Sequence, residues 1–133
     1  MRWPGVALVF SSLVAAGPAF AHHSVAAIYD REKTVEVKGV LSKIELQNPH
    51  STLELTVPGV DGRSTVWVVE SRGVQGMTRI GFDQHAVAVG DKVTVTGAPS
   101  RSVEHAIWLS TLETAAGKRY DFSFRGQPAF GAP

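Results

Sequence analysis

Apolar and polar residues alternate along much of the chain after residue 33, with the period of two that is typical of half-buried β-strands. The cleanest alternation covers residues 51–57, where Leu53, Leu55 and Val57 are separated by polar side chains. Further strands are predicted at residues 34–46, 65–69, 92–96 and 106–112, and an edge strand at 120–124. The chain is therefore predicted to be rich in β-structure.

Two segments depart from simple alternation. In the first strand the apolar positions change phase after Gly39, which predicts a bulge or sharp bend there. Residues 71–81 place Val74, Met77 and Ile80 three positions apart, which predicts a short helix. Three strands, one helix and two or three more strands predict an all-β fold, a small OB-like β-barrel with five to six strands and one short helix. Another small β-barrel or a β-sandwich is the main alternative.

The first 21 residues have a different pattern. Arg2 precedes an apolar run over residues 6–16, and the small residues of Ala19-Phe20-Ala21 follow. This order is typical of a cleaved signal peptide, and the run is shorter than the roughly 20 residues that a membrane-spanning helix needs. We expect cleavage after Ala21 and export to the periplasm or the cell exterior, with an uncleaved anchor as the alternative.

Cleavage would divide the chain into four parts. These are a signal peptide (1–21), an N-terminal arm (22–33), one OB-like barrel domain (34–125) and a flexible C-terminal tail (126–133). The absence of cysteine excludes disulfides, thiolate metal sites and a lipid-modified terminal cysteine. Without Arg2, the twelve basic and twelve acidic residues balance, which argues against nucleic acid or an anionic membrane as a partner. No stable membrane anchor is expected after cleavage.

Several short motifs resemble an uncharacterised family of short exported bacterial proteins (DUF6152-like). They are His22-His23-Ser24, Gly39, Asn48-Pro49-His50, residues 67–70, Arg79-Ile80-Gly81 and residues 89–93. The resemblance extends from His22 to about Glu113 and implies an exported, small protein without implying an activity. Residues 90–97 also have a looser similarity to periplasmic bacterial OB-fold proteins.

Catalytic motifs are scarce in this sequence. It contains no G-x-S-x-G, H-E-x-x-H, P-loop or dinucleotide-binding fingerprint. The sequence therefore favours a binding protein over an enzyme.

The histidines provide the most specific hypothesis. Cleavage after Ala21 would place His22 and His23 at a free N-terminus, where the amine and imidazole nitrogens form a chelate suited to copper. His50 follows the first predicted strand and His105 precedes the fifth, in loops that lie at the ligand-binding end of an OB barrel. An arm folded across that end would allow His22 or His23 to meet His50 or His105, and these four histidines are the candidate metal ligands. The alternative is that the terminal histidines simply begin a disordered tail and that His50 and His105 are loop residues.

Three further residues complete the candidate site. Glu70 ends an apolar strand, where its carboxylate either orients a histidine ligand or faces water. Trp67 and Trp108 lie on predicted strands and either pack in the core or line a ligand face. The sequence thus predicts a non-enzymatic exported protein that binds copper or another divalent metal. The alternative is a metal-free interaction module, or accessory subunit, that binds a partner protein or a small apolar ligand.

Overall fold

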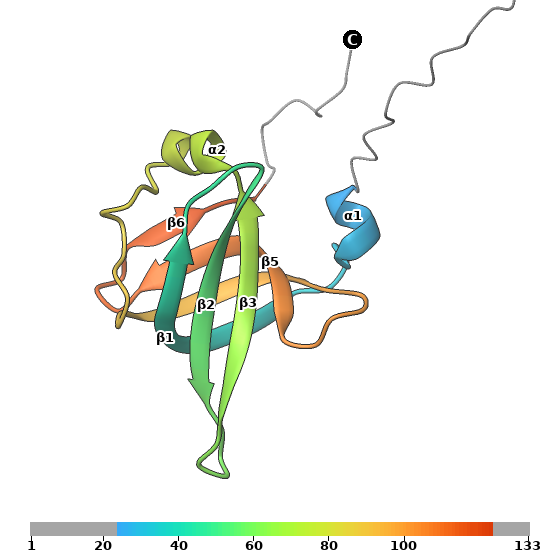
Figure 1. The fold of residues 1–133 in the computed structure, drawn as a ribbon, viewed down its shortest axis with the longest axis vertical. Coiled ribbons are helices and arrows are strands. Elements are labelled where there is room, and N and C mark those ends of the chain that lie inside the picture. The colour runs from blue at the N-terminus through green and yellow to red at the C-terminus, as the bar shows by residue number, and fades with distance from the viewer. Residues whose placement is uncertain (1–23, 124–133) are drawn as a thin grey trace, which may run out of the picture.

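The computed structural model describes residues 24–123, so the predicted signal peptide, His22, His23 and the predicted tail lie outside the described residues. The elements are α1 (Val25–Ile28), β1 (Val35–Glu45), β2 (His50–Pro58), β3 (Ser64–Arg72), α2 (Val74–Arg79), β4 (Lys92–Pro99), β5 (Ala106–Thr114) and β6 (Arg119–Asp121) (Figure 1). Among these elements, no helix is long and apolar enough to cross a membrane.

Five strands form a closed barrel. Their order is β3-β2-β1-β4-β5, and a parallel pairing of β3 with β5 closes the ring at Val68–Ala106, Val69–Ile107 and Glu70–Trp108. The short β6 pairs with the later part of β5. The predicted small all-β barrel is confirmed, with one extra strand and with short helices.

Alternating side chains of the strands fill the barrel. Leu53 and Leu55 of β2, Val95 of β4 and Leu109 of β5 are fully buried in one apolar cluster. The helix α2 lies at one end of the barrel, opposite the β2–β3 hairpin tip, and adds Met77 to this cluster (Figure 1). The period-two pattern predicted these strands correctly because every second side chain of a strand points into the barrel. These side chains are apolar, since burial away from water stabilises the fold.

The irregularity of β1 lies beyond the predicted position. The pairing with β2 shifts between Leu41 and Lys43, and the buried Val37 and Leu41 keep one phase through Gly39. The bulge prediction at Gly39 was therefore wrong by two to four residues. Gly39 has a different role, because a Cβ atom there would lie 2.8 Å from the Thr56 carbonyl oxygen. Glycine allows the two strands to approach closely at this point.

The described part of the N-terminal arm lies against the outside of the barrel. The Asp30 amide donates to the Pro99 carbonyl over 2.8 Å, and the Arg101 amide donates to the Ile28 carbonyl over 2.9 Å. A guanidinium nitrogen of Arg101 also lies 3.5 Å from the Asp30 carboxylate. We call residues 25–30 the docked arm. Its position matters for function because it covers the wall beside the candidate site.

Candidate functional site

His50 begins β2 directly after the Asn48-Pro49 turn. The turn is held by α2, because the Val74 amide donates to the Asn48 side-chain oxygen over 3.0 Å. In the strand register His50 faces Arg72 of β3. Ser51, the next residue, is buried inside the barrel, so the alternation of the strand turns His50 to the outer wall, where its side chain is 38% exposed.

Glu70 reaches the same outer wall from β3. It pairs with Thr52 of β2, which lies two positions after His50, so strand alternation places the two side chains on one face. One Glu70 carboxylate oxygen contacts Nδ1 of His50, and the other accepts a hydrogen bond from the Tyr29 hydroxyl. Both oxygens of this carboxylate are therefore engaged, which fixes its orientation.

Tyr29 belongs to the docked arm and is almost completely buried. Burial raises the pKa of its phenol, and the hydrogen bond to Glu70 and the negative charge of that carboxylate raise the pKa further. Tyr29 consequently stays protonated throughout the physiological pH range. It is a permanent hydrogen-bond donor to Glu70.

Trp108 forms the base of this group of side chains. Its ring lies 5.0 Å from the His50 ring at an interplanar angle of 78°, and 5.8 Å from the Tyr29 ring at 51°. The first contact is edge-on and the second is tilted, and edge-on contacts are a favourable aromatic geometry. We refer to His50, Glu70, Tyr29 and Trp108 as the His50 cluster.

The contacts of His50 determine which ring nitrogen is open to a ligand. An ionised carboxylate only accepts hydrogen bonds, so Nδ1 of a neutral His50 carries the hydrogen and Nε2 carries the lone pair. A carboxylate on one imidazole nitrogen and a metal on the other is the usual arrangement of histidine ligands. The cluster therefore fits one histidine ligand with its orienting carboxylate. Across residues 24–123 no group of three His, Cys, Asp or Glu side chains is placed to hold a metal ion, so further ligands would have to come from elsewhere.

His105 does not join the His50 cluster. It precedes Ala106, the β5 partner of Val68, and its ring packs against Trp67 at 5.0 Å. His50 lies beside Arg72, five residues beyond Trp67 on β3, which corresponds to roughly 16 Å along the strand. His50 and His105 therefore lie apart on the barrel wall.

The two tryptophans lie in different apolar clusters. Trp67 packs against the main core inside the barrel, whereas Trp108 packs with Tyr29 and Ala98 on the outer wall. Trp108 lies beneath the docked arm and is almost completely buried, with 5% of its surface exposed. A single ligand face that contains both indoles is therefore not formed.

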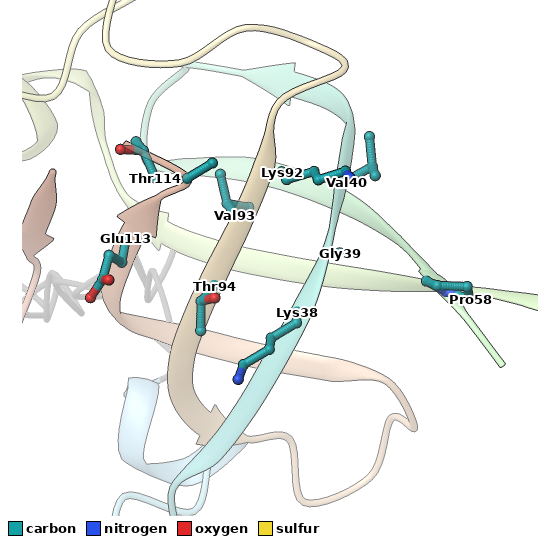
Figure 2. A pocket seen from close by; sticks show the side chains of 10 residues that line it. Lys38, Gly39, Val40, Pro58, Lys92, Val93, Thr94, Glu113 and Thr114 are labelled. Atoms are coloured by element: carbon teal, nitrogen blue, oxygen red, sulfur yellow. The ribbon is translucent and has the colours of Figure 1, made fainter. Parts of the chain in front are cut away.

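A surface hollow lies away from these residues. It has a volume of about 350 Å³ and is lined by side chains of β1, β4 and β5, including Lys38, Thr94 and Glu113 (Figure 2). Lys38 also forms an ion pair with Glu36 at 3.2 Å. None of the histidines or tryptophans discussed above lines this hollow, so it does not extend the His50 cluster.

Sequence reasoning named three members of the His50 cluster and missed Tyr29. The hydroxyl of Tyr29 reaches a carboxylate that is 41 positions away in the chain, and no local periodicity encodes such a contact. The available signal was the apolar run Val25-Ala26-Ala27-Ile28-Tyr29 between polar residues, which indicates that the arm packs against the barrel.

The fold and the cluster define a small β-barrel protein that carries a histidine–carboxylate pair on its outer wall. The chain belongs to DUF6152, a family of unknown function, whose family model matches residues 11–107. The matched region includes Tyr29, His50 and Glu70. No curated protein matches the chain.

Proposed function

We propose that this protein is a non-enzymatic, exported protein of the periplasm or cell exterior that binds copper or another divalent metal. His50 is the ligand on the barrel, Glu70 orients it, and His22 and His23 complete the metal site. The observation that carries the proposal is the engagement of His50 Nδ1 by Glu70, which leaves Nε2 available to a metal.

Chain connectivity supports a contribution of the terminal histidines to a site at His50. Val25 packs against the cluster that contains Trp108, and the Trp108 ring lies 5.0 Å from the His50 ring. An extended chain spans at most about 3.3–3.6 Å per residue, so the two residues of chain from Val25 to His23 can reach about 7 Å and the three residues to His22 about 10 Å.

The proposed ligand set suits copper. Cleavage after Ala21 gives His22 a free amine, which chelates a metal together with an imidazole of the arm. His50 then adds a nitrogen that is held by the barrel. Nitrogen-rich sets of this kind favour Cu(II) among the divalent metals. The proposal therefore depends on correct export and processing.

The test is a Cu(II) titration, followed by electron paramagnetic resonance, on protein that has been exported and cleaved by its own signal. Mass spectrometry verifies that the protein begins at His22. We expect one tight equivalent with a multi-nitrogen spectrum, lost in His50→Ala and retained in His85→Ala. His85 is a suitable control because it is an exposed histidine outside the cluster.

Two outcomes would overturn the proposal. Tight binding that is indifferent to His50→Ala would reduce the site to a chelate at the terminus. Absence of tight binding would exclude the metal site and would favour the alternative, an interaction module that binds a partner protein.

A further inference from the structure

The first half of β3 has an open edge. β3 pairs with β2 along its whole length, and its pairing with β5 on the other side covers Val68, Val69 and Glu70. The first half of β3 runs on past this pairing to the hairpin tip (Figure 1). Within the part of the chain that the structure describes, residues 64–67 therefore have no neighbouring strand on that side. We call these residues the open β3 edge.

Strand alternation identifies the backbone groups at this edge. The Val68 amide donates to the His105 carbonyl, so it points toward β5. Backbone groups two residues apart on a strand point to the same side, so the amide and carbonyl of Ser64 and of Val66 point to the open side. These groups have no hydrogen-bond partner among residues 24–123. They are consequently available to water or to another strand.

The open β3 edge lacks the features that usually keep edge strands apart. It contains no charged residue and no proline, and Val66 on its outer face is 50% exposed. Charges, prolines and very short strands normally prevent pairing between exposed edges. β6 is protected in this way, because it is short and carries the charged Arg119 and Asp121. The open β3 edge instead presents a neutral, partly apolar strand to water.

We propose that the open β3 edge pairs antiparallel with the open β3 edge of a second copy of this chain, around a two-fold axis at Thr65. This axis places Ser64 opposite Val66 of the second copy, and Val66 opposite Ser64. Residues that face each other as a hydrogen-bonded antiparallel pair exchange both of their backbone bonds. The two pairs then use every open amide and carbonyl of Ser64 and Val66 in both copies.

The side chains of the edge favour a second copy as the occupant. Around a two-fold axis the same surface meets itself, so a charge at the axis would face its own sign. Ser64, Thr65 and Val66 are uncharged. The preceding Arg63 comes to lie opposite Trp67 of the second copy, which keeps the two arginines apart. The open β3 edge is therefore complementary to itself.

The interface is small, because it uses one short stretch of strand from each copy. Small interfaces are typical of weak and transient association. We therefore expect a monomer–dimer equilibrium that shifts toward the dimer as protein concentration rises. The interface contains no residue of the His50 cluster, so it goes beyond the proposed function and does not depend on it.

Cysteine cross-linking tests both the pairing and its register. The chain contains no cysteine, so one introduced thiol reports one contact. Thr65 faces its own copy at the axis as a non-hydrogen-bonded pair, with Cα atoms about 4.5 Å apart. A disulfide spans Cα distances of roughly 4.4–6.8 Å. Thr65→Cys is therefore expected to form a disulfide-linked dimer under mild oxidation, measured on a non-reducing gel.

Ser64→Cys is the matched control for the register. The two copies of Ser64 would be offset by about 6.6 Å along the strands and about 4.8 Å across them, so their Cα atoms would lie roughly 8 Å apart. This distance is too long for a disulfide. Ser64 is more exposed than Thr65, so random collision would favour cross-linking of Ser64→Cys. Preferential cross-linking of Thr65→Cys therefore identifies the paired register.

Analytical ultracentrifugation measures association of the protein without a cross-link, in a buffer with a chelator so that metal ions do not join molecules. The average mass of the wild type should rise toward that of a dimer with concentration. Val66→Lys places like charges close together across the axis and should stay monomeric. Val89→Lys makes the same change at another exposed valine, outside β3, and should associate like the wild type. Hydrogen exchange of the Val66 amide should slow as the dimer forms.

Two results would overturn the proposal. The first is a wild type that stays monomeric at every concentration, with equal cross-linking of Thr65→Cys and Ser64→Cys. The open β3 edge would then be left to an extended segment of another protein. The second is a dimer that Val66→Lys does not weaken, which would locate the contact elsewhere on the barrel. Dimers that are lost in Val66→Lys and trapped preferentially by Thr65→Cys would support the pairing.

Discussion

The imidazole of His50 stands edge-on to the indole of Trp108, with ring centroids 5.0 Å apart and planes at 78°. This contact restricts the rotation of the histidine, and the carboxylate of Glu70 restricts it further from another side. A ring that is held in this way loses little conformational entropy when it binds a ligand. The contact also places a fluorescent side chain next to the proposed ligand.

Copper bound at His50 is therefore expected to quench Trp108. Cu(II) quenches indole emission at short range, and Trp108 is in ring contact with His50. In a Trp67→Phe variant that has been cleaved after Ala21, Trp108 is the remaining tryptophan and its emission should fall with the first equivalent of Cu(II). Fluorescence titration checks this outcome. The same titration after His50→Ala should show no loss at that stoichiometry, and equal quenching in both proteins would contradict a site at His50.

Glu70→Gln tests the orienting carboxylate. Glutamine keeps the size of the side chain and accepts from Tyr29, but its amide lacks the charge and the second carboxylate oxygen that hold His50. We expect copper affinity to fall by about 10–100-fold, measured by competition titration. Glu54→Gln is the control, because Glu54 also lies on the barrel wall and faces Lys43 instead. An equal loss in both variants would indicate a general effect of charge.

The strands were largely predictable because one face of each loses its water contacts on folding. The alternation at 51–57 corresponds to β2, and the apolar spacing at 71–81 corresponds to α2, which is shorter than predicted. The position of the bulge in β1 was not predictable from this pattern. Val40 is apolar yet lines the outer hollow, so counting apolar residues assigned the phase change to Gly39.

The sequence predicted several residues of the candidate site but not which of them lie together. His50 and Glu70 were named from their residue types, and the β2–β3 register determines that they share a face. The register between two strands cannot be derived from the residue types along the sequence. The same lack of register allowed His105 to be grouped with His50, although β3–β5 pairing places it beside Trp67. Tyr29 required knowledge of where the arm lies.

Gly97→Ala should destabilise the barrel strongly. A Cβ atom at Gly97 would lie 2.2 Å from the Trp108 carbonyl oxygen, which belongs to the backbone of β5 and cannot move independently. Overpacking of this kind costs about 1–3 kcal/mol and occasionally more. Urea unfolding measures the loss of free energy of unfolding. Thr94→Ala on the same strand should cost less than about 1 kcal/mol, and equal effects would contradict the close approach of β4 and β5.

Alkaline pH should weaken the fold through Tyr29. Its pKa is raised above the ordinary value of 10.0 by burial and by Glu70. The folded state therefore keeps the phenol proton at a pH where the unfolded state has released it. The stability that this neutral phenol contributes is fully present below pH 10.0 and is lost as pH rises toward the folded pKa. The slope contributed by one group is at most about 1.4 kcal/mol per pH unit.

Tyr29→Phe removes the titrating group while it keeps the ring on Trp108. Free energies of unfolding in urea, measured from about pH 9 to about pH 11, should therefore fall more steeply for the wild type than for the variant. The other tyrosine and the lysines are common to both proteins, so their contributions cancel in the difference. Parallel pH profiles would show that the Tyr29 phenol is not buried against Glu70 in solution. A difference that opens above pH 10.0 would place the docked arm on the barrel wall.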